Sequence, residues 1–240
     1  MTVCIAALCN DGENCVLASD QMTTAHFPIG YEFETEDVEK IVCIVDSAFV
    51  LTAGDVLFAR EVIEETRKRL VDRVVRVKAL TEAARTAYQH IRILQVVHTQ
   101  LEPRGLNLDS YYQSQQRLMP AIVQMVDQAL VGHNPGVELI IAGKDDLGCH
   151  IYTVQSPGRS ICHNPVGFAA IGSGGPHAVY SLIEAGYRKS LGIEEVKRMI
   201  EQAKKRAEVA PGVGADTRII PVCEETPEGE VADGGSTRND

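Results

Sequence analysis

The chain has 240 residues, which is enough for one sizeable domain with a hydrophobic core of its own. Its formal net charge of −10 argues against nucleic acid or an anionic membrane as the main partner. No run of 18 apolar residues exists, so no membrane span is expected, and the start of the chain lacks the basic segment of a signal peptide. The seven cysteines are scattered without a C-x-x-C pair, which favours a reducing, cytoplasmic location.

The first third of the chain predicts short strands. They are expected in four apolar runs, at 3–8, 15–20, 40–45 and 48–54. The NDG sequence at 10–12 is a strong hairpin-turn signal between the first two runs. A polar stretch at 21–39 is expected to be irregular.

The remaining chain alternates between helical and strand patterns. Amphipathic periodicity predicts helices at 55–73, 80–101, 109–131, 176–190 and 194–208. Asp55 is the expected N-cap of the first helix, and Pro120 marks a kink or a start. Further strands are expected at 137–143, 149–154, 167–172 and 216–222.

This order of elements is explained by two sheets stacked between layers of helices. We therefore expect an α+β fold, a four-layer αββα sandwich. The chain is interpreted as one domain over 1–223, with a helical insertion at about 76–131. The tail at 224–240 has no apolar anchor and is expected to be disordered.

Thr2 is the first candidate for chemistry. Met before a small residue is commonly removed, which would give Thr2 a free α-amine. A threonine hydroxyl alone is a poor nucleophile, but an α-amine with an ordinary pKa of about 7.7–8.0 is an effective base near neutral pH. An amino-terminal threonine therefore holds a nucleophile and a general base in one residue. The alternative is that Thr2 is merely a small second residue.

Three more candidates lie at strand ends. The hairpin returns Asp20 toward Thr2, Lys40 begins the next strand, and Gly54 ends the strand after it. A nearby lysine lowers the pKa of a hydroxyl and an amine, an aspartate can hold that lysine, and a glycine N–H can donate to an oxyanion. Taken separately, an Asp or Lys at a strand end is more often a solvated surface group.

Together these segments resemble the proteasome β-type subunits and their bacterial relative, a two-ring peptidase with an ATPase cap. Both are N-terminal-nucleophile hydrolases. TVCIAALCNDG resembles the opening strand and turn, VLASDQMTT the VLAAD-x-x-x-T segment, and EKIVCIVDSAFVLTAG the KI…AG segment. VELIIAGKDDLGCHIYTV and AAIGSGGPHAVYSLIEAGYRKSLGIEEV resemble two later segments, and AIGSGG with its flanks is the most specific piece. The resemblance covers about residues 2–72 and 137–222.

The resemblance implies a threonine-type peptidase with five catalytic positions. Thr2 would be the nucleophile, Lys40 would lower its pKa, and Asp20 would orient Lys40. The N–H of Gly54 would form the oxyanion hole, and Ser173 would hydrogen-bond near the Thr2 amine. Read without the resemblance, Ser173 is a turn residue.

The resemblance also implies a substrate and partners. Thr24 would pair with the backbone of a peptide or unfolded protein substrate, and Thr52 would lie at the S1 pocket. Members of the family form rings, so a homo-oligomeric ring is expected, and an ATPase or other regulator is a further candidate partner. No metal or organic cofactor is implied.

Two features depart from the family pattern. Extra residues around GENC predict a bulge in the first hairpin. Ala210 and Val213 stand where the family places an Asp and a Ser. In the family, that Asp and Ser support the amine and the nucleophilic water. Asp216 and Glu208 are the nearby candidates to replace the two missing residues. The alternatives to a peptidase are therefore a non-catalytic structural subunit of a ring, and a stand-alone amidase or transpeptidase.

Overall fold

Two antiparallel sheets form the centre of the protein. The structure is a computed structural model that describes residues 2–26, 32–35, 39–45, 47–70 and 76–223. The first sheet has the order β10-β1-β2-β11, with β1 at Cys4–Cys9, β2 at Asn14–Asp20, β10 at Phe168–Ile171 and β11 at Thr217–Val222. The second has the order β5-β6-β7-β8-β9, with β5 at Ile41–Val45, β6 at Ala48–Ala53, β7 at Glu138–Asp145, β8 at Gly148–Gln155 and β9 at Arg159–Cys162.

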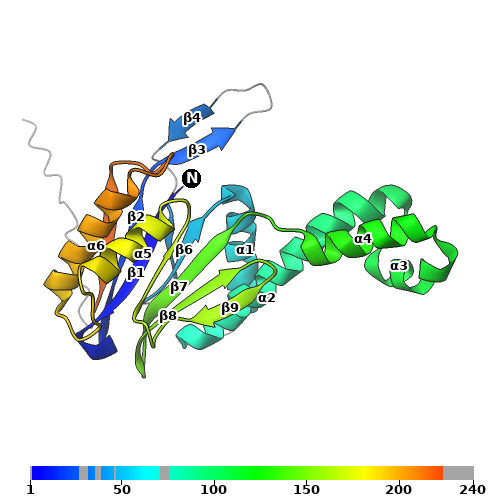
Figure 1. Cartoon of the computed structure of the whole chain (residues 1–240). Coiled ribbons are helices and arrows are strands. Elements are labelled where there is room, and N and C mark those ends of the chain that lie inside the picture. The colour runs from blue at the N-terminus through cyan, green and yellow to red at the C-terminus, as the bar shows by residue number, and fades with distance from the viewer. Residues whose placement is uncertain (1, 27–31, 36–38, 46, 71–75, 224–240) are drawn as a thin grey trace, which may run out of the picture.

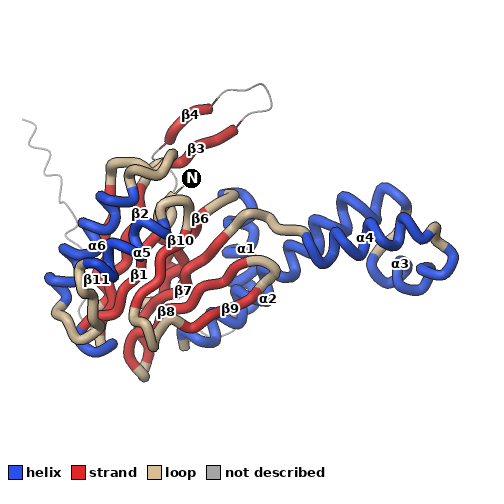
Figure 2. The backbone as a smooth tube through the Cα atoms, viewed as in Figure 1, coloured by secondary structure: helices blue, strands red, loops and turns tan. Residues whose placement is uncertain are grey.

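A pair of helices covers the outer face of each sheet, as Figures 1 and 2 show. Helices α5 (Gly175–Glu184) and α6 (Ile193–Ala207) pack on the first sheet, and α1 (Val56–Arg69) and α2 (Val77–Val96) pack on the second. The predicted four-layer αββα sandwich is confirmed. None of the helices in the described part of the chain is both long and apolar enough to cross a membrane.

Strand β1 is buried on both faces, which explains its unbroken apolar sequence. Ile5 and Ala7 belong to the core beneath α5 and α6. Ala6 and Leu8 point the other way, into the core between the sheets. Burial on both sides fixes the register of β1, because a slip of one residue would exchange its two faces.

Several predicted boundaries shift. The helix predicted at 80–101 is α2 followed by a π-helical turn, Val97–Leu101, and the helix predicted at 109–131 is two helices, α3 (Leu108–Ser114) and α4 (Pro120–Gly132). Pro120 is a start, not a kink. These helices form an arm that extends from the body (Figure 1), with a small core around Leu101, Tyr111 and Val126.

Three strands escape the sequence prediction. Strands β3 (Thr23–His26) and β4 (Glu32–Thr35) form a hairpin inside the stretch predicted to be irregular. Strand β9 is a four-residue edge strand. The predicted bulge near GENC is wrong, because β1 and β2 pair without a shift; the irregularity lies between Cys43 and Val45 in the β5–β6 pair. The one-domain interpretation stays a prediction, and the tail at 224–240 lies outside the described residues.

A matched pair of leucines tests the packing of the second sheet. Leu139 is fully buried against the helices α1 and α2, whereas Leu147 is 69% exposed. We expect Leu139→Ala to lower the free energy of unfolding by about 2–5 kcal/mol and Leu147→Ala to change it by less than about 0.5 kcal/mol. Urea unfolding followed by circular dichroism measures both. Equal losses would contradict the packing described here.

Candidate functional site

The ends of β1 and β2 bring Thr2 and Asp20 together. Ser19 pairs with Cys4, and the N–H of Asp20 donates to the carbonyl of Val3 at 3.2 Å. Thr2 directly precedes this pairing and is 3% exposed. The hairpin that the NDG turn predicts is therefore present, and it returns Asp20 to the start of the chain.

Asp20 holds three segments with one carboxylate. Its Oδ1 accepts from the Lys40 ammonium at 2.8 Å and from the N–H of Val3 at 2.9 Å. Its Oδ2 accepts from the N–H of Gly214 at 3.1 Å. The Asp20 side chain is fully buried and that of Lys40 is 5% exposed, so each charge depends on the other for compensation.

Lys40 reaches this carboxylate from the second sheet. Its carbonyl accepts from the N–H of Thr52 at 3.0 Å, which fixes its backbone to the end of β6. Its ammonium also donates to the carbonyl of Met22. Since Asp20 Oδ1 contacts both the Lys40 ammonium and the N–H of Val3, the positive charge lies beside the residue that follows Thr2.

Gly54 follows β6 in a conformation that only glycine adopts readily. Its φ is +107°, and a Cβ at this position would lie 1.9 Å from the carbonyl oxygen of Gly136. A side chain here would therefore require the backbone of the neighbouring segment to move. Gly54 and Thr2 line the same cavity.

The loop after β10 contacts Thr2 from the other side. The N–H of Thr2 donates to Ser173 Oγ at 3.2 Å, and Ser173 Oγ donates to the Thr2 carbonyl at 3.4 Å. The N–H of Gly174 donates to the same carbonyl at 3.1 Å. Five predicted positions are thus brought together: Asp20 and Lys40 by hydrogen bonds next to Thr2, Ser173 by direct contact with it, and Gly54 across the cavity.

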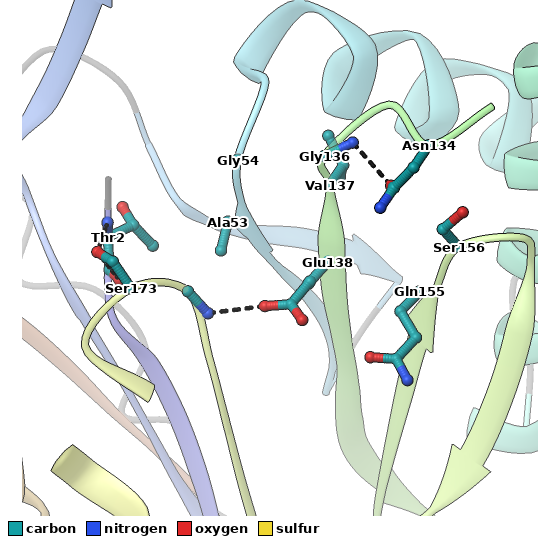
Figure 3. Close-up of a pocket in the computed structure, with 11 residues that line it drawn as sticks. Thr2, Ala53, Gly54, Asn134, Gly136, Val137, Glu138, Gln155, Ser156 and Ser173 are labelled. Atoms are coloured by element: carbon teal, nitrogen blue, oxygen red, sulfur yellow. Dashed lines mark hydrogen bonds between the residues drawn. The ribbon is translucent and has the colours of Figure 1, made fainter. Parts of the chain in front are cut away.

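A cavity of about 430 Å³ opens beside Thr2, between the ends of the two sheets (Figure 3). Thr2, Gly172 and Ser173 form one wall, and the end of β6 forms another. The opposite wall comes from the segment that enters β7 and from the end of β8. The residues that line the cavity are Thr2, Ala53, Gly54, Asn134, Gly136, Val137, Glu138, Gln155, Ser156, Gly172 and Ser173.

Helix α2 holds the segment that forms the opposite wall. The Tyr88 hydroxyl donates to the Val137 carbonyl at 2.9 Å, and His133 Nε2 lies 2.8 Å from Gln95 Oε1. Arg92, which is largely buried, donates to the carbonyls at the end of α4, including that of His133 at 3.2 Å. The arm of helices therefore ends in a segment that is fixed to the body at the cavity.

Glu138 is the cavity residue that the sequence reasoning missed. It opens β7, pairs with Ala53 of β6, and accepts a hydrogen bond through Oε2 from the N–H of Gly172 at 2.9 Å. The available signal was a charged residue at the head of the apolar run VELIIAG, beside the strand that ends in Gly54.

Of the two predicted substrate-binding residues, Thr52 does not line this cavity. Thr52 lines a neighbouring hollow of about 450 Å³, whose lining includes apolar residues such as Val42 and Ile63 and four charged residues, Glu39, Arg60, Glu64 and Arg67. The backbone of Thr24 lies in β3, opposite Glu34, and its side chain is outside the described part of the structure.

Cys4 is buried two residues after Thr2. Burial raises the pKa of Cys4 to about 12, against a smaller opposing effect of the Lys40 charge, so its thiol stays protonated at neutral pH. Among the described residues, no group of three His, Cys, Asp or Glu side chains converges as metal ligands.

Comparisons with known proteins agree with this arrangement. A family model described as a proteasome subunit matches residues 106–211. The proteasome subunit beta of Methanosarcina thermophila is 26% identical over 229 residues, which cover 91% of this chain and 86% of the relative. The proteasome subunit beta 2 of Pyrobaculum neutrophilum is 33% identical over 104 residues, which cover 43% of this chain and 44% of the relative. The corresponding subunit of Pyrobaculum aerophilum is 33% identical over 86 residues, which cover 35% and 40%. The chain therefore spans less than half the length of the two Pyrobaculum relatives.

The resemblance to the proteasome β-type family is confirmed.

The departures from the proteasome β-type pattern have a structural account. Ala210 and Val213 are buried in the core beneath α5 and α6, so they support the segment by packing. The backbone of Gly214 then supplies a donor to Asp20. A second buried lysine, Lys204, binds the Ala215 carbonyl and fastens the same segment to α6.

Glu208 and Asp216, the acidic candidates to replace the missing Asp, have other surroundings: Glu208 pairs with lysines, and Asp216 is exposed. Glu208 accepts from Lys204 at 2.9 Å and from Lys205 at 3.1 Å, and the Lys204 hydrogen bond lowers the pKa of Glu208. Asp216 is exposed. The structure shows no contact of either carboxylate with Thr2 or Ser173 among the described residues.

The buried pair predicts a large cost for removing one charge. Asp20→Asn leaves the Lys40 ammonium buried without its counter-charge, so we expect a loss of about 3–5 kcal/mol in the free energy of unfolding. Asp146→Asn is the control, because Asp146 pairs with Arg76 on the surface and such pairs contribute about 0–1 kcal/mol. The double variant Asp20→Asn, Lys40→Met should lose less than the sum of the single variants. Equal stability of Asp20→Asn and the control would contradict the coupling.

Proposed function

We propose that the chain is a threonine-type amide hydrolase, a peptidase of the proteasome-like class. The observation that carries the proposal is the buried Asp20–Lys40 pair, whose carboxylate accepts a hydrogen bond from Val3, the residue that follows Thr2. Thr2 and Gly54 line the same cavity. This arrangement supports a hydroxyl nucleophile beside a fixed positive charge and a backbone donor.

The proposed reaction begins once Thr2 is the amino terminus. Thr2 Oγ attacks the carbonyl carbon of a peptide bond, and the α-amine accepts the hydroxyl proton. The positive field of Lys40 favours the developing alkoxide. The N–H of Gly54 donates to the oxyanion of the tetrahedral intermediate.

The intermediate then collapses to an ester. The amine passes its proton to the leaving nitrogen, the C–N bond breaks, and an ester links the acyl group to Thr2 Oγ. Water attacks this ester with the amine as base and restores the free hydroxyl. Ser173 holds the amine through the contact that the Thr2 nitrogen makes at 3.2 Å.

Substrate binding is assigned to the two predicted threonines. A peptide would run beside β3, where Thr24 pairs with its backbone, and the side chain before the cut would enter the hollow lined by Thr52. This hollow combines the apolar residues Val42, Val56 and Ile63 with charged residues at Glu39, Arg60, Glu64 and Arg67, which supports a side chain with an apolar stem and a polar end.

A non-catalytic ring subunit is the second candidate. The observation that favours it is the burial of Ala210 and Val213 where the family places an Asp and a Ser. A scaffold role would require the fold but not a free amine on Thr2. Labelling by a threonine-directed probe separates the two candidates.

Lys40 is the test residue for the proposed chemistry. Its charge should shift the pKa of a titrating group beside it by roughly 1–3 units, so its loss should slow labelling by one to several powers of ten. We expect Lys40→Ala to abolish labelling of Thr2 by an epoxyketone or β-lactone probe, and Lys40→Arg to restore little, because the guanidinium is wider than the ammonium.

The measurement is a time course of intact mass after addition of the probe, with circular dichroism to confirm folding. Lys68→Ala is the control, because the side chain of Lys68 is 73% exposed, and it should label like the wild type. Labelling of Lys40→Ala at the wild-type rate would remove Lys40 from the mechanism.

We also propose that the protein assembles into a ring of its own copies. Tyr180 and Ile183 on α5 are 71% and 60% exposed and lie one turn apart, which supports a contact surface on this outer helix. Sedimentation velocity should therefore show species larger than the 26.1 kDa monomer.

Charge on this surface should weaken the assembly. Tyr180→Glu with Ile183→Glu should shift the sedimentation profile toward the monomer, whereas Val209→Glu, at a similarly exposed apolar residue, should not. A wild-type protein that sediments only as a monomer over a wide concentration range would contradict the proposed assembly.

A further inference from the structure

Among the described residues that line the cavity beside Thr2, one has an ionisable side chain. That group is the carboxylate of Glu138, and the other described lining side chains are neutral. Lys40 does not line the cavity, because its ammonium is turned toward Asp20. Among the described residues, no cationic side chain forms a salt bridge with Glu138. Glu138 therefore supplies the charge among the described side chains that line the cavity.

The Glu138 carboxylate is fixed in place by a backbone donor. Its Oε2 accepts from the N–H of Gly172 at 2.9 Å, and Figure 3 shows the side chain extending from β7 toward this loop. Gly172 is itself confined, since its φ is +85° and a Cβ would lie 2.3 Å from the Thr2 carbonyl oxygen. One carboxylate oxygen is thus engaged, and the other makes no hydrogen bond to any described residue.

Three neutral residues with side-chain oxygens line the same cavity as this carboxylate: Asn134, Gln155 and Ser156. Gln155 and Ser156 line the cavity from the end of β8, and their side chains make no hydrogen bond within the described residues. Asn134 is different, because its Oδ1 already accepts from the N–H of Gly136 at 2.9 Å. A group with several N–H donors and a positive charge would match the free oxygens of Glu138, Gln155 and Ser156.

We propose that this cavity is a binding subsite for the side chain of a lysine or arginine in a peptide, with Glu138 as the residue that recognises the charge. The proposal rests on the proposed function, because it places the subsite beside the reacting threonine. Its volume of about 430 Å³ lies within the range of ligand pockets. It is distinct from the hollow beside Thr52, so one peptide could present a side chain to each of the two sites.

Glu138→Gln is the informative substitution. A glutamine keeps an oxygen that can accept from the N–H of Gly172, so it removes the charge and leaves the loop contact available. Glu201→Gln is the matched control, because Glu201 is exposed on α6 and lines neither hollow. Thermal unfolding of each variant by circular dichroism confirms the fold.

The experiment measures binding separately from turnover. Fluorescein-labelled hexapeptides, in which one lysine is moved through an alanine and leucine background, are compared by fluorescence polarisation with the same peptides carrying norleucine. The full chain is used with Thr2→Ala, so that no peptide is cut. We expect at least one position to favour lysine over norleucine by about tenfold, which corresponds to about 1.4 kcal/mol.

The ratio of lysine-peptide to norleucine-peptide affinity should fall to about one in Glu138→Gln and persist in Glu201→Gln. Equal binding of lysine and norleucine peptides, or a preference that survives Glu138→Gln, would overturn the subsite. If instead the proposed function is wrong, the result differs. The chain with Thr2 intact would then cut no peptide, while the preference for binding lysine peptides would remain.

Discussion

The buried pair of Asp20 and Lys40 is the interaction on which the candidate site depends. Two charges in a dry interior are tolerated only when each is paired and hydrogen-bonded. Asp20 meets this requirement with donors from Lys40, Val3 and Gly214, which come from three separate segments. Because the carboxylate can satisfy all three only in one arrangement, the lysine charge, the start of β1 and the loop before β11 are fixed relative to one another.

The second sheet forms the other half of the cavity, and apolar packing positions its strands there. Apolar burial places β6 and β7 side by side, so that Gly54 follows one strand and Glu138 begins its neighbour. Helix α2 then restrains the entry to β7 through Tyr88 and Arg92. The cavity beside Thr2 therefore depends on both sheets, one held at its end by an ion pair and the other by side-chain contacts to backbone carbonyls.

The sequence predicts most of the fold, because its apolar runs alternate clearly with turns and helical patterns. The same patterns put Asp20, Lys40 and Gly54 at strand ends, and the family resemblance gave them roles that stay predictions. The hairpin β3–β4 was missed because the sequences of its strands, TTAH and EFET, contain no clear alternation of apolar and polar residues. Glu138 was missed because the charged residue at the head of VELIIAG does not by itself indicate a contact with Gly172, which lies 34 positions away.

The central claim is that Thr2 is the nucleophile, and the location of a covalent probe tests it most directly. The full-length protein is treated with an epoxyketone, digested, and its amino-terminal peptide is sequenced by tandem mass spectrometry. The account predicts a peptide that begins at Thr2 and carries the probe on that residue alone. An amino-terminal peptide that retains Met1 and carries no probe, or a probe on a residue other than Thr2, would contradict it.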